Sequence, residues 1–359
     1  MRRRPVLIAL GALAAAPASA IIDPARVLAF PRDFGSHPDS RTEWWYATGW
    51  LAPRGAAEPT HGFQVTFFRS RTGVAADQPS RFAARQLVFA HAALTDLAAQ
   101  KLRHDQRIAR EGFGIATASE TDTDVVLRGW TLHRTGPPDA SAYDTTLTSE
   151  AAGFGLTLRL TASQPLLLQG TAGFSRKGPQ PAQASHYYSQ PQLVVEGRLG
   201  VDGRTQDVQG RAWFDHEWSD AYLAAEAVGW DWIGMNLLDG SALTAFRLKR
   251  ADGSALWAGG SFRAPGGAVR SFADDEVRFV PGRRWTSPAS RTGYPVEWGV
   301  ETPAGRFRVR ALVDAQELDS RASTGSIYWE GLSELLDAAG HRVGLGYLEM
   351  TGNSAALRF

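Results

Sequence analysis

The sequence predicts an all-β protein, and three observations support this prediction. Runs of alternating apolar and polar residues occur at 62–69, 146–160, 193–199 and 307–313. Asp-Gly or Ala-Gly pairs between apolar runs occur at 202–203, 239–240, 252–253 and 339–340, as in consecutive antiparallel hairpins. The chain is also rich in tryptophan and β-branched residues, which fit a pleated surface. Residues 95–110 fit either a helix or a further hairpin.

The two halves of the chain resemble each other. Residues 44–50, rich in tryptophan, precede a strand at 61–69, and residues 230–236 precede a similar strand at 242–250. This pattern indicates an internal duplication or a chance likeness between aromatic strands. A duplication implies two antiparallel β-barrels in tandem, each able to close its edges and hold a small ligand.

The chain divides into an N-terminal leader and two predicted domains. Residues 1–20 hold three arginines, an apolar run and Ala18-Ser19-Ala20, which together are typical of a cleaved signal peptide. A stretch rich in proline and glutamine at 175–192 suggests domains at 21–185 and 186–359. We therefore expect a soluble periplasmic or secreted protein with no transmembrane segment after signal cleavage. An uncleaved, membrane-anchored form is the alternative, and the Sec and Tat export routes both remain open.

Charge and cysteine content exclude several classes of protein. Loss of the three leader arginines moves the formal charge from +1 to about −2, with charges of both signs spread along the chain, so we expect no nucleic-acid partner. The chain contains no cysteine, which excludes disulfides, thiol nucleophiles and thiolate metal sites. No G-x-S-x-G, H-E-x-x-H or phosphate-loop motif occurs. The sequence therefore predicts neither a metal nor a cofactor.

The segment 213–218, Trp-Phe-Asp-His-Glu-Trp, is the strongest candidate for a chemical site. In a strand, Phe214, His216 and Trp218 would share one face, and Trp213, Asp215 and Glu217 the other. Titratable groups among aromatic rings can have pKa values suited to proton transfer. The alternative is a buried charge network that stabilises a barrel, and we expect Glu43 and Asp215 to form structural ion pairs of that kind.

Two kinds of function remain after these exclusions. The protein either carries out acid–base chemistry on an apolar molecule or binds such a molecule without a reaction. A protonated carboxylic acid in such a site can donate to a carbon–carbon double bond. Tryptophan faces can stabilise the resulting cation by roughly 0.5 to 2 kcal/mol. Added water would complete a hydration.

Several motifs carry a resemblance to a known family. They are Glu43-Trp44-Trp45-Tyr46, His186-Tyr187-Tyr188-Ser189, the segment 213–218, Gly229-Trp230-Asp231-Trp232, Tyr328-Trp329-Glu330-Gly331 and the segment 346–352. In this order they resemble the AttH-like secreted proteins, which form one superfamily with the carotenoid 1,2-hydratases, or hydroxyneurosporene synthases. The resemblance implies two lipocalin-like barrels. Many AttH-like relatives are called secreted hydrolases, but the motif of a serine nucleophile is absent here.

The resemblance also implies a set of site residues. His216 and Trp218 match the catalytic histidine and tryptophan of the hydratases. The hydratases' later Tyr-x-Asp pair has no match, so Asp231 or Glu217 would have to supply the proton. The ligand-binding candidates are the aromatic residues Trp44, Trp45, Tyr46, Tyr187, Tyr188, Trp213, Trp230 and Trp232.

Two functions follow as hypotheses. The first is a hydratase-like lyase that adds water to a double bond of an apolar ligand. The second is a noncatalytic carrier of a lipid or another lipophile that works beside an envelope transporter, as AttH-like proteins are suspected to do. A third interpretation makes the aromatic residues a plain core and places the function on the surface.

Overall fold

The computed structural model describes residues 22–74, 78 and 80–357 and confirms the all-β prediction. The described residues contain two short 3-10 turns, η1 (Arg32–Phe34) and η2 (Asp274–Glu276), and no α-helix. Accordingly, none of them forms a helix that is long and apolar enough to cross a membrane. The predicted signal peptide lies outside the described residues.

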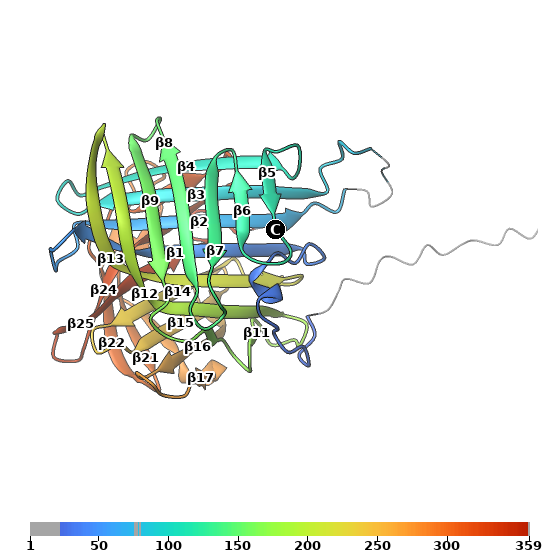
Figure 1. Cartoon of the computed structure of the whole chain (residues 1–359). Coiled ribbons are helices and arrows are strands. Elements are labelled where there is room, and N and C mark those ends of the chain that lie inside the picture. Colours follow the sequence, from blue (N-terminus) through green and yellow to red (C-terminus); the bar gives the residue numbers. More distant parts are fainter. Residues whose placement is uncertain (1–21, 75–77, 79, 358–359) are drawn as a thin grey trace, which may run out of the picture.

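The first antiparallel sheet has 13 strands and curls into a nearly closed, lipocalin-like barrel (Figure 1). Its central strands follow the order β4-β3-β2-β1-β13-β12-β9-β8-β7-β6-β5, and β5 and β6 approach β3 and β4 across the barrel. The strands are β1 (Thr42–Pro53), β2 (His61–Arg71), β3 (Gln86–Asp96), β4 (Lys101–Arg110), β5 (Ala116–Ala118), β6 (Asp124–Leu127), β7 (Trp130–Thr135), β8 (Ala142–Ser149), β9 (Phe154–Thr161), β10 (Leu167–Leu168), β11 (Phe174–Arg176), β12 (Ala184–Val201) and β13 (Arg204–Ser219).

The second antiparallel sheet has 10 strands and forms the second lipocalin-like barrel, in the lower part of Figure 1. Its order is β17-β16-β15-β14-β25-β24-β22-β21-β18, with β23 on β24, and β19 and β20 form a separate hairpin. The strands are β14 (Gly229–Leu237), β15 (Ala242–Lys249), β16 (Ala255–Arg263), β17 (Arg270–Phe272), β18 (Arg278–Pro281), β19 (Arg284–Thr286), β20 (Gly293–Pro295), β21 (Glu297–Thr302), β22 (Gly305–Ala311), β23 (Glu317–Ser320), β24 (Ser326–Leu336) and β25 (Arg342–Met350).

The segment that fitted a helix or a hairpin and the stretch expected at the domain boundary both contain strands. Residues 95–110 contain the end of β3 and all of β4, so the hairpin alternative holds there. The carboxylate of Asp96 accepts hydrogen bonds from the N–H groups of Ala98 and Ala99 and so stabilises the turn. The stretch 175–192 contains the end of β11 and the start of β12, which pairs with β13 in the first sheet. The change from the first sheet to the second therefore lies between Ser219 and Gly229, and the expected division at 185/186 does not coincide with it.

The strand pairing supports the internal duplication. In both sheets the aromatic strand pairs with the next strand, β1 with β2 and β14 with β15, and also with the last strand of its sheet, β13 or β25. An acid and a tryptophan face an arginine and a phenylalanine in each case: Glu43 and Trp44 face Arg69 and Phe68, and Asp231 and Trp232 face Arg247 and Phe246. Both halves thus have an acid, a tryptophan, an arginine and a phenylalanine in the same register. This agreement exceeds a general likeness between aromatic strands.

Three apolar clusters stabilise this arrangement. One fills the first barrel and includes Trp45, Phe214 and Trp218. A second fills the other barrel around Ile233 and Trp298. The third, which includes Tyr46, Trp213 and Trp232, lies between the two sheets. Because side chains alternate along a strand, β1, β13 and β14 each contribute to a barrel interior and to the space between the sheets.

Candidate functional site

A cavity of about 290 Å³ lies between the two sheets and is the candidate functional site. Both sheets contribute to its wall, because residues of β1, β2, β3, β4 and β13 face residues of β14, β24 and β25. Its aromatic lining includes Trp44, Tyr46, Tyr187, Tyr222, Trp230 and Trp232. Four carboxyl groups and one histidine also line it: Asp215, Glu217, Glu330, Glu349 and His91. The cavity therefore combines an apolar wall with several titratable groups, as ligand sites commonly do.

The face alternation predicted for residues 213–218 holds in β13. Asp215 and Glu217 line the cavity, whereas Phe214 and Trp218 belong to the core of the first barrel. His216 is fully buried on that second face. The sequence motif therefore supplies two separate groups of side chains, one on each side of the same sheet.

Asp215 is a buried carboxyl with three hydrogen-bond donors. Its Oδ1 accepts from the Ser189 hydroxyl at 2.5 Å and from the Trp213 indole at 2.7 Å. Its Oδ2 accepts from the Tyr187 hydroxyl at 2.9 Å. Burial outweighs these donors and raises the pKa of Asp215 to about 7. The structure thus gives Asp215 hydrogen bonds in place of the expected ion pair.

Glu217 lies beside a buried lysine. Lys177 Nζ is 2.9 Å from Glu217 Oε1, and the Ser185 hydroxyl donates to the same oxygen. Burial raises the pKa of Glu217, although Lys177 and Ser185 oppose the change. Glu217 can therefore hold a proton more readily than an exposed glutamate.

Glu330 and Glu349 form a carboxyl pair on the opposite wall of the cavity. They are direct partners across β24 and β25, and side chains in such positions lie on the same face of the sheet. Burial and the charge of Glu349 raise the pKa of Glu330 well above its usual value. Burial, with a smaller effect of Asp215 and Glu217, raises the pKa of Glu349 to about 7. Because two adjacent carboxylates repel each other, we infer that the pair retains a proton near neutral pH.

Glu349 corresponds to Glu217 in the internal duplication. Glu217 is the partner of Trp44 across β1 and β13, and Glu349 is the partner of Trp232 across β14 and β25. Each half of the chain therefore places one glutamate next to one tryptophan on the cavity wall.

A neutral histidine lines another part of the cavity. His91 Nδ1 lies 2.8 Å from the Tyr328 hydroxyl, and its Nε2 lies 2.9 Å from the Ser323 hydroxyl. Burial lowers the pKa of His91 to about 3, so the ring is uncharged at neutral pH. The amide of Gln64 donates to the Tyr328 oxygen at 3.1 Å, which leaves the Tyr328 hydroxyl proton free to bond His91.

Sequence reasoning missed Glu330, Glu349 and His91 as site residues. Glu330 and Glu349 lie in the C-terminal motifs that carried the family resemblance, and each stands among apolar or aromatic neighbours in a strand. An acid in that setting is a signal of a buried, functional carboxyl. His91 has no comparable signal, because Tyr328 and Ser323 lie more than two hundred residues away in the chain.

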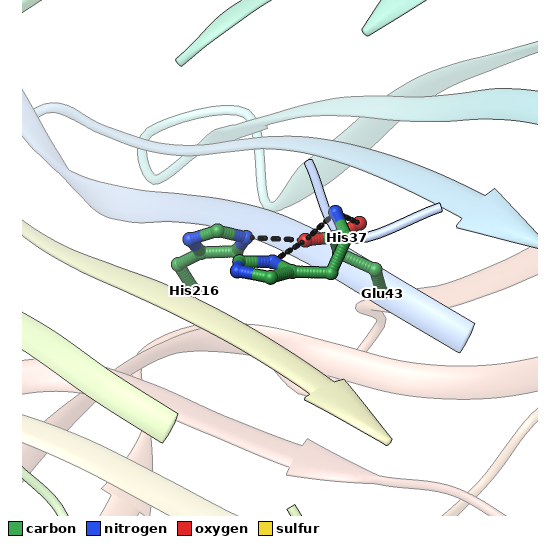
Figure 2. Close-up of side chains that lie close together, drawn as sticks. All are labelled: His37, Glu43 and His216. Carbon is green, nitrogen blue, oxygen red and sulfur yellow. Dashed lines mark hydrogen bonds and ion pairs between the residues drawn. The ribbon is translucent and has the colours of Figure 1, made fainter. Parts of the chain in front are cut away.

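His216 belongs to a closed network in the first barrel, with His37 and Glu43 (Figure 2). Glu43 Oε1 lies 2.7 Å from His37 Nδ1 and 2.9 Å from His216 Nε2. Glu43 Oε2 accepts from Arg69 Nε at 2.8 Å. Burial raises the pKa of Glu43, but the hydrogen bonds of His216 and His37 outweigh burial and hold this pKa well below its usual value. Glu43 is therefore the buried ion-pair residue that the sequence suggested.

The two histidines of the network have different hydrogen-bond partners. The other nitrogen of His37 lies 3.0 Å from Asp33 Oδ1, so both ring nitrogens of His37 face carboxylate oxygens, which only accept. The His37 ring thus lies between two carboxylates. His216 Nδ1 lies 3.0 Å from the Tyr188 hydroxyl, and burial lowers the pKa of His216 to about 4. A neutral His216 can donate to Glu43 and accept from Tyr188.

Indole rings enclose this network. Trp218 stacks on His37 with 3.7 Å between the ring centroids, and Trp45 stacks on His216 at 4.8 Å. His216 and Trp218 are absent from the lining of the cavity between the sheets. The structure therefore places these two predicted catalytic residues inside the packed first barrel.

The network is also the one group among the described residues whose side chains are spaced to bind a metal ion. One potential ligand atom from each of His37, Glu43 and His216 lies within 4.8 Å of the others. A metal cation there would lie beside the positive charge of Arg69, which opposes its binding. We therefore interpret the group as a hydrogen-bond network, and the absence of a metal or cofactor remains a prediction.

The remaining predicted site residues divide between the two faces of their strands. Trp44, Tyr46, Tyr187, Trp230 and Trp232 line the cavity. Trp45 and Tyr188 lie in the first barrel, and Trp213 packs between the sheets behind the cavity wall. Asp231 points into the second barrel, where Arg247 Nε and Lys249 Nζ each lie 2.8 Å from its carboxylate. Asp231 therefore lies away from the cavity, beside two cationic side chains.

The pKa shifts of the cavity carboxyls predict a pH effect on stability. A folded-state pKa raised from 4.5 to about 7 means that Glu349 binds more protons in the folded than in the unfolded protein between these pH values. Stability should therefore fall as pH rises through this window and become constant above it. We expect Glu349→Gln to raise the free energy of unfolding by on the order of 2 kcal/mol at pH 8 and by little at pH 4. Urea denaturation at both pH values would check this.

Glu301→Gln is the matched control, because the Glu301 side chain is 43% exposed. It should change stability little at either pH. An equal effect of Glu349→Gln at both pH values would show that the Glu349 carboxyl has an ordinary pKa.

The chain belongs to the AttH-like family, whose sequence model matches residues 21–353. It is similar to the crystal structure of an AttH protein from Nitrosomonas europaea, with 46% sequence identity over 93% of this chain and 99% of that one and a TM-score of 0.85. No curated protein matches the chain in sequence.

Two more distant structures share the fold. Kievitone hydratase from Nectria haematococca has 15% identity and a TM-score of 0.67, with 93% of this chain and 94% of that one covered. The protein CghA has 14% identity and a TM-score of 0.51, with 88% of each chain covered. At this level of identity, the two structures support the two-barrel fold alone.

Proposed function

We propose that this protein is exported, binds an apolar ligand in the cavity between its two sheets, and adds water to a carbon–carbon double bond of that ligand as a hydratase-like lyase. The observation that carries the proposal is the aromatic cavity with carboxyl groups whose pKa values burial raises to about 7. Such acids hold a proton at neutral pH and can donate it. Export rests on the signal peptide predicted from the sequence.

The hydration would proceed in two balanced steps. A protonated carboxyl of the Glu330–Glu349 pair donates its proton to one carbon of the double bond, whose π electrons form the new C–H bond and leave a carbocation. The faces of nearby rings such as Trp232 stabilise this cation. Water then attacks the cationic carbon and forms the C–O bond, and the proton that the water oxygen loses returns to the carboxylate.

His91 is a second group that can take this proton. Its ring is neutral, and it lines the cavity together with Tyr328. A low pKa makes it a weak base, but the proton on the attacking water becomes strongly acidic once the C–O bond forms. The acid and the base then lie on different sheets, β24 and β25 for the glutamates and β3 for His91.

The family resemblance suggests a carotenoid or a similar polyene as the substrate class, and it gives His216 and Trp218 the catalytic role. That role would require the interior of the first barrel to admit a ligand beside a ring that is now fully buried. We favour the cavity carboxyls because they line an existing space.

A noncatalytic carrier is the second candidate function. The broad aromatic lining favours it, because such a wall binds apolar molecules without any reaction. The carrier would hold a lipid or another lipophile and work beside an envelope transporter. Binding without turnover would distinguish it from the lyase.

The binding step can be tested with the apolar fluorescent probe N-phenylnaphthylamine. We expect the protein to bind the probe and Ser70→Trp to weaken binding by about tenfold, because Ser70 lines the cavity near its edge and is partly exposed. Thr157→Trp is the matched control, since Thr157 is exposed on β9 and does not line the cavity. Fluorescence titration would measure both affinities.

Equal probe affinity in Ser70→Trp and the unchanged protein would contradict binding in this cavity. Mass spectrometry of an organic extract of the purified protein would identify the natural ligand. Its incubation with the protein should then yield a product heavier by one molecule of water.

A further inference from the structure

Two neighbouring loops of the first sheet expose an aromatic and basic patch, which we call the Phe82–Phe113 patch. The Phe82 and Phe113 rings stack with 5.4 Å between centroids, although the two residues are 65% and 46% exposed. The guanidinium of Arg110 lies 3.9 Å from the Phe113 ring centroid, and that of Arg81 lies 5.8 Å from it. These four residues define the patch.

Exposed apolar side chains are concentrated in these two loops. Eight large apolar side chains are exposed among the described residues, and four of them lie in these two loops: Val74, Phe82, Phe113 and Ile115. Isolated exposed apolar residues need no explanation, but a cluster indicates an interaction surface.

The backbone conformation that exposes the Phe113 ring is strained. Phe113 has a φ angle of 62°, in the left-handed region that a bulky residue rarely adopts. Gly112 and Gly114 flank it, and a bridge between Gly112 and Ala116 closes the tight turn. A strained backbone that exposes an aromatic ring is a reason to look for a role of that ring.

The charge near the patch is positive. Arg81, Arg85 and Arg128 are exposed, and Arg110 is partly exposed. Arg110 also donates to the carbonyl oxygen of Phe82 at 3.0 Å, which ties the two loops together. Glu111, the neighbouring acid, is partly buried, and four arginines surround the patch against this one acid.

The patch adjoins the edge of the cavity. Leu87 lines the cavity and is the direct partner of Arg110 across β3 and β4. Ser70, another lining residue, is the partner of Leu87 across β2 and β3. The end of β2, the start of β3 and the turn before β5 lie at one end of the first sheet (Figure 1).

We infer that the Phe82–Phe113 patch docks the protein on the surface of an anionic phospholipid bilayer. Aromatic rings enter the interface between headgroups and acyl chains, and arginines attract the anionic headgroups. The positive charge favours this partner over a neutral apolar surface. Docking at this place would bring the edge of the cavity to a source of apolar molecules. The inference goes beyond the proposed function and holds for a carrier as well as for a lyase.

Flotation with vesicles would test the inference. We expect the protein to float with phosphatidylglycerol vesicles and to bind phosphatidylcholine vesicles much less. High salt should weaken the binding to phosphatidylglycerol. Phe82→Ser/Phe113→Ser should weaken binding by at least tenfold, since two buried rings are lost. Arg81→Gln/Arg110→Gln should weaken binding to phosphatidylglycerol by roughly fivefold for each arginine.

Matched controls lie elsewhere on the surface. Leu238 directly follows β14 and is 69% exposed. The Arg306 side chain is 82% exposed in the β21–β22 hairpin. Leu238→Ser and Arg306→Gln should bind vesicles like the unchanged protein. Circular dichroism would verify that every variant is folded.

Three results would overturn the inference. The first is the absence of flotation with phosphatidylglycerol. The second is unchanged vesicle binding in both patch variants. The third is a concentration-dependent dimer in analytical ultracentrifugation that both patch variants abolish, because the patch would then contact a second copy of this chain.

Discussion

Glu43→Gln is expected to lower the free energy of unfolding by about 3 to 5 kcal/mol. The Glu43 side chain is 0% exposed and that of its partner Arg69 is 1% exposed, so the substitution leaves a guanidinium buried without its counter-ion. The substitution also removes the charge that His37 and His216 face. Urea denaturation at neutral pH would measure the change.

A double variant distinguishes the effect of the ion pair on stability from the effect of side-chain packing. Replacing both partners, in Glu43→Met/Arg69→Met, should cost less than Glu43→Gln alone, because no buried charge remains unpaired. Glu301→Gln serves as the control at an exposed ion pair. A loss below about 1 kcal/mol in Glu43→Gln would show that the network does not stabilise the first barrel.

Glu349→Gln is expected to slow hydration of the extracted ligand by about 100-fold or more, with little change in ligand affinity. Glutamine keeps the size of the side chain but cannot donate the proton. Because the acid form of Glu349 is the active one, the rate should fall as pH rises above about 7. The measurement is product formation under saturating ligand, followed by mass spectrometry.

His216→Gln is the decisive comparison for this second prediction. If the cavity carboxyls act as acids, His216→Gln should alter stability more than turnover, because the ring lies in the packed barrel. Loss of turnover in His216→Gln together with full activity of Glu349→Gln would move the reaction to the first barrel. Binding without turnover in the unchanged protein would favour the carrier.

The sequence predicted the architecture because the relevant signals are local. Alternation along the strands and the short turns gave the all-β class, and the period of two gave the separation of Asp215 and Glu217 from His216 and Trp218. The aromatic strands at 44–50 and 230–236 also pair with their following strands as the repeat suggested.

The site depends on contacts that are far apart in the chain. Whether His216 faces a hollow or a packed interior is decided by Trp45, His37 and Tyr188, which three other segments supply. The pairing of Glu330 with Glu349 is a matter of strand register, which a single sequence leaves undefined. The polar residues of β12 are buried through pairing with β13, although their composition is that of a loop.

The correspondence of Glu217 with Glu349 has a consequence for how a molecule would lie in the protein. Both glutamates stand beside a tryptophan of their own half, Trp44 or Trp232, and the halves meet face to face. The glutamates of the two halves therefore lie near each other, since Glu217 contributes to the raised pKa of Glu349. A bound molecule would then meet acids and indoles from both halves at one place along its length.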